Sequence, residues 1–232
     1  MPHLEIGVTW CSIFKRPGVF APISFRALKY AYRAPSLFAS KMTTAGYPVR
    51  SFACDEELRL AVFDGSVRTI HDEVDFLYFA SHGRFEPTGC EAFLHLTDWL
   101  PLTTGVGKSK LKIIVFDTCE MIIGSRDWTA EWSKVNMGPN VRMILGFDGS
   151  AASDQQRALR GLAFAEALLQ GRTIAYSWIK AVRSTSTSQY SRAVAIGLGD
   201  DDADAQSVLR SATLAAIPGV RTGNSLSFAY TY

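Results

Sequence analysis

The sequence has 232 residues, of which 47% are hydrophobic and 20% are charged, and its formal net charge is +2. This composition is typical of a globular protein and excludes a disordered or fibrous chain. We expect one domain over residues 1–232, because a chain of this length can bury a large core. The sequence has no block of Lys and Arg and no stripe of basic and aromatic residues, which excludes nucleic acid as the expected partner.

The first residues contain no charged leader followed by a long apolar stretch, so no signal peptide is expected. No run approaches the 18 or so apolar residues that a membrane span needs, so no membrane partner is expected either. These features predict a cytoplasmic protein. The four cysteines are scattered and form no CxxC pair, which favours reduced thiols over disulfides or a zinc ribbon. The sequence indicates no metal, no cofactor and no particular oligomeric state.

Strands are predicted where short apolar runs contain many β-branched and aromatic residues. These runs are residues 4–11, 49–54, 74–83, 111–120, 141–146, 193–198 and 226–232. Helices are predicted where apolar residues keep helical spacing or acids open a segment. These segments are residues 24–33, 36–45, 55–63, 126–135, 153–169 and 173–183.

The connections follow from turn and cap residues. Ser24 or Ser36 is expected to cap a helix, and Gly46 and Gly171 are expected to end helices. Residues 84–110 contain several Pro and Gly residues, which predict mostly loop with a short strand at 92–96. The acidic run at 200–204 is expected to be an exposed loop or a helix start.

The alternation of near-continuous apolar strands with helices predicts the fold class. Buried strands of this kind are typical of a mainly parallel sheet covered on both faces, which is a three-layer α/β sandwich. In such sheets ligands bind beyond the carboxyl ends of the strands. The functional site is therefore expected at that edge of the sheet.

Two of the predicted strands end on reactive side chains. The run Val74-Asp-Phe-Leu-Tyr-Phe-Ala-Ser-His-Gly83 delivers His82, and Leu111-Lys-Ile-Ile-Val-Phe-Asp-Thr-Cys-Glu120 delivers Cys119. Adjacent parallel strands would bring the imidazole and the thiol together. A neighbouring imidazole favours the nucleophilic thiolate, so the pair predicts a Cys-His catalytic dyad. The backbone amides of Gly83 and Cys119 could hold the oxyanion of an acyl intermediate.

Other chemistries fit the sequence less well. The stretch Gly105-Val-Gly-Lys-Ser109 lacks the first glycine of a phosphate-binding loop and runs into a strand rather than a helix. The His and Cys residues at positions 82, 90, 95 and 119 show no zinc-ligand spacing. A serine-hydrolase Gly-x-Ser-x-Gly motif is absent. These observations leave cysteine chemistry as the leading hypothesis.

The two motifs resemble those of a known group of enzymes. Phe79-Ala-Ser-His-Gly83 is similar to the histidine motif of the caspase-like cysteine peptidases, and Asp117-Thr-Cys119 is similar to the Asp-x-Cys motif of metacaspases. The stretches Leu145-Gly-Phe147 and Phe164-Ala-x-Ala-Leu-Leu-x-Gly171 also resemble a group of bacterial proteins thought to share that fold. The resemblance covers residues 4–200.

The resemblance implies roles for individual residues. It makes Cys119 the nucleophile and His82 the general acid and base, and it places Asp117 near a pocket for a basic substrate side chain. Residues at the predicted rim of the site add Glu120, Asp148 and Arg84 as substrate-binding candidates. The Gln-Ala-Cys-x-Gly signature of caspases is absent, and Glu120 stands beside the thiol, where an inward carboxylate would disfavour the thiolate.

The sequence therefore predicts a cysteine-dependent acyl-transfer enzyme, most simply a peptidase, that acts on a peptide or a small-molecule acyl substrate. Two alternatives stay open. One is a thiol-dependent cyclase or acyltransferase that acts on a small metabolite in a biosynthetic pathway. The other is a caspase-like binding module without catalytic activity.

Overall fold

The structure is a computed structural model, and it describes most of the chain. The described residues are 4–10, 30–51, 70–81, 83–86, 89–94, 98–101, 106–119, 137–149, 151, 155, 157–186 and 191–230.

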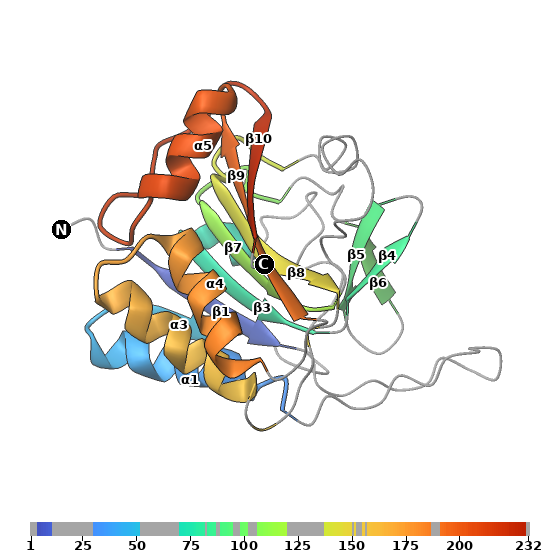
Figure 1. Cartoon of the computed structure of the whole chain (residues 1–232), viewed down its shortest axis with the longest axis vertical. Coiled ribbons are helices and arrows are strands. Elements are labelled where there is room, and N and C mark those ends of the chain that lie inside the picture. Colours follow the sequence, from blue (N-terminus) through green and yellow to red (C-terminus); the bar gives the residue numbers. More distant parts are fainter. Residues whose placement is uncertain are drawn as a thin grey trace.

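The centre of the molecule is a seven-stranded sheet with strand order β10-β9-β8-β7-β3-β1-β2. Strands β2, β1, β3, β7 and β8 are parallel, whereas β9 and β10 run antiparallel to their neighbours. This mixed but mainly parallel arrangement confirms the predicted α/β class (Figure 1). The strands are β1 Ile6–Trp10, β2 Val49–Ser51, β3 Phe76–Ala80, β7 Ile113–Asp117, β8 Met143–Gly149, β9 Ser191–Gly199 and β10 Ser225–Tyr230.

The inner strands are apolar along their whole length because both of their faces are buried. Every residue of β3 and β7 is buried, including the alternate residues that point to opposite faces of the sheet. Phe79 of β3 and Phe116 of β7 make an edge-to-face contact with ring centroids 6.2 Å apart. The continuous apolar runs in the sequence were therefore a correct indication of central parallel strands.

Helices cover one face of the sheet. The four longer helices all contribute side chains to a single core cluster with β3, β7 and β8, and Figure 1 shows them together on one side. These helices are α1 Arg33–Thr44, α3 Arg160–Leu169, α4 Ile174–Thr185 and α5 Asp202–Ser211; short 3-10 helices are η3 Ile70–Glu73 and η6 Arg157–Leu159. The helices predicted at 55–63 and 126–135 lie outside the described residues.

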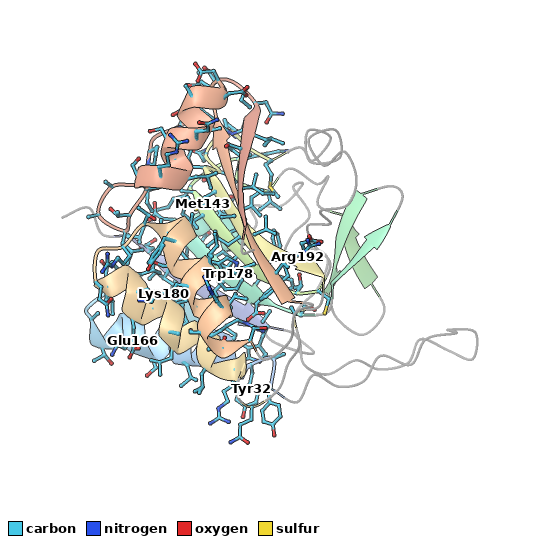
Figure 2. The ribbon with its side chains drawn as sticks, in the orientation of Figure 1. Tyr32, Met143, Glu166, Trp178, Lys180 and Arg192 are labelled. Atoms are coloured by element: carbon cyan, nitrogen blue, oxygen red, sulfur yellow. The ribbon has the colours of Figure 1, made fainter. Side chains whose placement is uncertain are left out.

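Aromatic side chains fill the space between this helical layer and the sheet. Trp178 of α4 is fully buried and contacts Phe147 of β8 and Phe164 of α3, with ring centroids 5.3 and 5.5 Å away. Its indole N–H donates a hydrogen bond to the carbonyl oxygen of Gly146 at 3.0 Å. Figure 2 shows Trp178 in the interior of the molecule. The contacts fix α4 against β8, because edge-to-face pairs add about 0.5–1.5 kcal/mol each to burial.

The structure confirms some of the helix ends predicted from the sequence and corrects others. Gly46 and Gly171 follow α1 and α3 with φ of 89° and 74°, which confirms both predicted ends. The side chain of Asp201 caps α5 by accepting the Asp204 N–H at 2.8 Å, so the acidic run is a helix start. The Ser36 cap was wrong, because α1 begins earlier, after Tyr32. Residues 30–32 form a turn instead of the predicted helix, and Ser24 lies outside the described residues.

The segment predicted to be mostly loop contains a second sheet. Strands β4 Gly83–Glu86, β5 Gly89–Leu94 and β6 Asp98–Pro101 form a three-stranded antiparallel sheet in the order β4-β5-β6. Figure 1 shows this sheet away from the helices. Gly89 and Pro101 had suggested loop, but they stand at strand ends, where a missing N–H or side chain is tolerated. The short strand predicted at 92–96 overlaps β5, whereas the loop prediction was wrong for β4 and β6.

In the described part of the chain, no helix combines the length and the apolar character needed to cross a bilayer. The cytoplasmic location and the single domain over residues 1–232 stay predictions.

Candidate functional site

The carboxyl ends of β3 and β7 meet at one edge of the sheet. Ala80, the last residue of β3, pairs with Asp117, the last residue of β7. Ser81 and Thr118 follow and are both buried. Cys119 comes next after Thr118, and it lies at the edge where the sequence predicted the site. His82 lies outside the described residues, so its place beside Cys119 stays a prediction.

Cys119 is half-buried and partly packed against the core. Its Sγ lies 3.6 Å from the carbonyl oxygen of Ala151, to which the thiol donates a hydrogen bond. Ala151 follows the end of β8, the next strand after β7 in the sheet. Cys119 forms no disulfide, and a partly accessible thiol at this edge can act as a nucleophile once it loses its proton.

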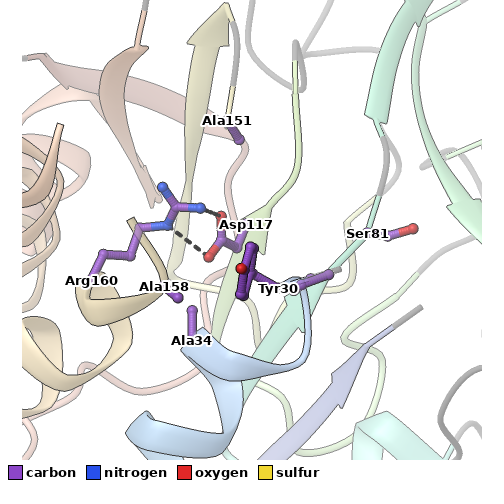
Figure 3. Close-up of a pocket in the computed structure, with 9 residues that line it drawn as sticks. Tyr30, Ala34, Ser81, Asp117, Ala151, Ala158 and Arg160 are labelled. Atoms are coloured by element: carbon purple, nitrogen blue, oxygen red, sulfur yellow. Dashed lines mark hydrogen bonds and ion pairs between the residues drawn. The ribbon is translucent and has the colours of Figure 1, made fainter. Parts of the chain in front are cut away.

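Asp117 is held by a buried network beneath Cys119. Its Oδ2 accepts hydrogen bonds from the Tyr78 hydroxyl and from Nε of Arg160, both at 2.8 Å. Its Oδ1 lies 2.6 Å from Nη2 of Arg160. Arg160 is the first residue of α3, so the pair joins the end of β7 to the start of a helix, as Figure 3 shows. The cation that Asp117 binds in the structure is therefore internal.

Burial controls the protonation of this network. Removal from water, reinforced by the negative charge of Asp117, raises the pKa of Tyr78 well above its ordinary value. Burial, the largest single influence, would lower the pKa of Arg160, but the interactions with Asp117 and Tyr78 together outweigh it, so that pKa is raised. The guanidinium also lies 4.9 Å from the centroid of the Phe147 ring. The network thus holds one neutral phenol and one paired cation and anion.

A narrow recess opens beside this network. Asp117 and Arg160 lie at its base, and Tyr30 and Ser81 also line it (Figure 3). Its free space is about 10 Å³, close to what a single water molecule needs. Among the described residues, the rest of the lining consists of alanines: Ala31, Ala34, Ala80, Ala151 and Ala158. The recess is therefore small and carries no unpaired charge from Asp117 or Arg160.

Asp148, predicted at the rim, lies near the end of β8. It is buried and forms an ion pair with Arg192, its cross-strand partner on β9. The Arg192 side chain is 55% exposed, and Figure 2 labels it on the sheet. The carboxylate of Asp148 thus has a cation partner within the protein, and a role in substrate binding stays a prediction.

The other predicted site residues are described in part or not at all. Gly83 begins β4 and pairs with Ala92 of β5, and Arg84 is the next residue of β4. Glu120 lies outside the described residues. The oxyanion role of Gly83 and the substrate roles of Arg84 and Glu120 stay predictions.

Sequence reasoning missed Tyr78 and Arg160. Tyr78 was read as an ordinary member of an apolar strand, although its hydroxyl needs a partner when it is buried. Arg160 stands four residues before Phe164, so helical spacing places it on the buried face of α3. The sequence did contain a signal for this pair: a single arginine on an apolar helix face and a single aspartate at the end of a buried strand. Buried charges require partners, so the two residues could have been predicted to pair.

The described residues contain no group of three or more His, Cys, Asp or Glu side chains that could hold a metal ion.

The fold and this edge define an α/β protein with a mainly parallel sheet and a reduced thiol beyond the end of an inner strand. Residues 28–208 match the family described as "Domain of unknown function (DUF6345)", and the chain belongs to this family. No curated protein matches the sequence.

Several solved structures are similar to the chain. The initiator caspase Dronc of Drosophila has a TM-score of 0.47 and 7% identity, over 81% of this chain and 74% of that one. Pro-Sf-caspase-1 has a TM-score of 0.42 and 13% identity, over 81% and 86%. A flavodoxin of Streptococcus pneumonia TIGR4 has a TM-score of 0.34 and 11% identity, over 72% and 98%. Because all three scores are below 0.5, the functional argument rests on the residues of this chain.

Proposed function

We propose that the chain is a cysteine-dependent acyl-transfer enzyme, most simply a peptidase, in which Cys119 is the nucleophile and His82 the general acid and base. One observation carries this proposal. Ala80 and Asp117 are paired at the ends of adjacent parallel strands. His82 and Cys119 each follow these residues by two positions in the sequence. Equal advance from a paired position favours a dyad that spans the ends of the two strands.

The proposed reaction begins when His82 takes the thiol proton of Cys119. The sulfur attacks the carbonyl carbon of the substrate, and a C–S bond forms as the carbonyl π bond becomes an oxyanion. Collapse of this intermediate breaks the C–N bond, and His82 donates its proton to the leaving amine. Water, deprotonated by His82, then attacks the thioester. The C–S bond breaks, the carboxylic acid leaves, and the proton returns to the thiolate.

The surroundings of Cys119 support this role. The thiol lies beside Ala151 at the carboxyl edge of the sheet, which is where open α/β sheets bind ligands. The proposed oxyanion donors are the backbone amides of Gly83 and Cys119. A caspase-like fold is part of the same proposal, and it is supported by the motifs Phe79-Ala-Ser-His-Gly83 and Asp117-Thr-Cys119, which begin on the neighbouring strands β3 and β7.

The test compares the wild type with Cys119→Ala and His82→Ala on a denatured mixture of cellular proteins. New peptide amino termini are identified by mass spectrometry. The proposal predicts new termini with the wild type and at least about 100-fold fewer with either variant, since general acid–base catalysis alone contributes that much. Undiminished cleavage by Cys119→Ala would overturn the proposal. An acyl adduct on Cys119 without cleavage of any protein would instead favour an acyltransferase or cyclase that acts on a small metabolite.

A further inference from the structure

Asp117, which stands two residues before the proposed nucleophile, has no free charge to offer a substrate. Both oxygens of Asp117 are within 2.8 Å of donor atoms on Arg160, and Oδ2 also accepts the Tyr78 hydroxyl. The Asp117 side chain is only 2% exposed. A cationic substrate group would have to displace a guanidinium that makes two close contacts with the carboxylate, and such paired contacts are the strong ones.

Arg160 is fixed in this position by its own surroundings. Its side chain is 6% exposed and lies over the Phe147 ring. The next residue, Gly161, packs so closely against the Ala34 carbonyl oxygen that a Cβ would collide with it. The start of α3 therefore cannot withdraw from the recess without breaking its contact with α1, which keeps the backbone of Arg160 in place.

The recess also limits the size of what it accepts. Five of its lining residues are alanines, and its free space of about 10 Å³ is close to one water molecule. Ala151 belongs both to this lining and to the hydrogen bond with Cys119. The recess thus lies next to the thiol, where the group attached to a reacting carbonyl would be placed.

We propose, on the basis of the function proposed above, that the site takes acyl donors whose group beside the reacting carbonyl is small and uncharged. Arg160 is the residue that sets this selectivity, because it neutralises Asp117. The site discriminates against cations because Asp117, whose two oxygens both contact Arg160, offers them no free charge. It discriminates against anions because the guanidinium is already paired, and an unpaired charge is costly to bury.

The test uses peptide acyloxymethyl ketones, in which a thiolate displaces the carboxylate leaving group and forms a thioether. Four probes differ only in the side chain beside the ketone: alanine, norleucine, lysine and glutamate. The rate of Cys119 labelling is measured by mass spectrometry. The alanine probe should label at least about tenfold faster than the lysine and glutamate probes. The norleucine probe has the lysine stem without its charge and should fall between them.

Two variants test the role of Arg160 in opposite directions. Arg160→Gln leaves Asp117 with an uncompensated negative charge, so the lysine-to-alanine rate ratio should rise at least about tenfold. Asp117→Asn leaves Arg160 with an unpaired positive charge, so the glutamate-to-alanine ratio should rise instead. Arg172→Gln, at an exposed position after α3, is the matched control and should change neither ratio.

The possible outcomes separate the selectivity, the role of Arg160 and the proposed function from one another. Equal or faster wild-type labelling by the lysine or glutamate probe overturns the selectivity and leaves the proposed function standing. Folded Arg160→Gln with unchanged ratios overturns the role of Arg160. If no probe labels Cys119 in the folded wild type, the proposed function fails and the selectivity with it. If both variants fail to fold, by circular dichroism, the wild-type rates alone decide the selectivity.

Discussion

Ala80 at the end of β3 lies beside Asp117 at the end of β7, in parallel register. The pairing defines which residues share the carboxyl edge of the sheet, because side chains in parallel strands advance together. Cys119 follows Asp117 by two positions, as His82 follows Ala80. The register places the ends of β3 and β7 at a single edge, and the place of His82 at that edge stays a prediction.

Removal of the Asp117 charge should destabilise the protein strongly. Asp117→Asn leaves the buried guanidinium of Arg160 without its anion, and breaking a buried pair costs about 3–5 kcal/mol. The free energy of unfolding is measured by urea denaturation. Asp148→Asn is the control. Arg192, the partner of Asp148, is 55% exposed and stays hydrated, so loss of this ion pair should cost no more than about 1 kcal/mol. Equal losses in the two variants would contradict the difference in burial.

Tyr78→Phe should change the dependence of stability on pH. The pKa of Tyr78 is raised well above its ordinary value in the folded protein, chiefly by burial. In the unfolded chain a tyrosine ionises near pH 10. The contribution of Tyr78 to the free energy of unfolding is therefore complete below about pH 10 and is lost as the pH rises further.

The Phe variant should therefore be less stable at pH 7 by about 1.5–3 kcal/mol, the worth of a hydrogen bond to a charged group. Above about pH 10 its stability should decline less steeply than that of the wild type. Urea denaturation from pH 7 to 11 measures both effects. Tyr176→Phe, at a side chain that is 49% exposed, is the control and should match the wild type.

Gly161→Ala should destabilise the contact between α1 and α3. Alanine usually stabilises a helix interior by about 1 kcal/mol relative to glycine. At position 161, however, the added Cβ would collide with the backbone of Ala34, which cannot yield as a side chain could. Such overpacking costs about 1–3 kcal/mol, so a net loss in thermal or urea stability is expected. Gly219→Ala, where nothing lies within 4 Å of the added atom, should leave stability nearly unchanged.

Thr118→Val should stabilise the protein. Thr118 is fully buried, and its hydroxyl has no hydrogen-bond partner in the described structure. An unsatisfied buried hydroxyl costs about 1–3 kcal/mol, and valine has nearly the same shape without that cost. Thr185→Val is the matched control, because the Thr185 hydroxyl donates to the Ala181 carbonyl oxygen at 2.9 Å and its loss should destabilise. A loss of stability in Thr118→Val would show that the Thr118 hydroxyl makes a stabilising contact.

The sheet could be predicted from the sequence because its inner strands are apolar on both faces. The continuous runs that end near Ala80 and Asp117 have no other reading in a protein without a long apolar span. The second sheet could not be predicted in the same way. Its strands are short and lie among proline and glycine residues such as Pro101, which closes β6, and these residues are equally typical of loops.

The sequence predicted which strand ends carry the site, but it did not predict which charged residues pair there. Cys119 stands near the end of the strand predicted at 111–120, so its place at the sheet edge followed from local pattern. The partner of Asp117 is Arg160, which stands 43 residues later in another element. Only the packing of α3 against the sheet brings them together, and no local pattern encodes that distance. The place beside Asp117 that was expected to hold a cationic group of the substrate is occupied by Arg160 of the protein itself.

The most direct test of the Cys119–His82 dyad is the rate at which iodoacetamide alkylates Cys119 at pH 7, followed by mass spectrometry of the peptide that contains it. An imidazole partner increases the thiolate fraction, so His82→Ala should slow alkylation at least about tenfold. His71→Ala removes a histidine from η3, before β3 begins, and should leave the rate unchanged. Equal rates in wild type and His82→Ala would contradict the dyad.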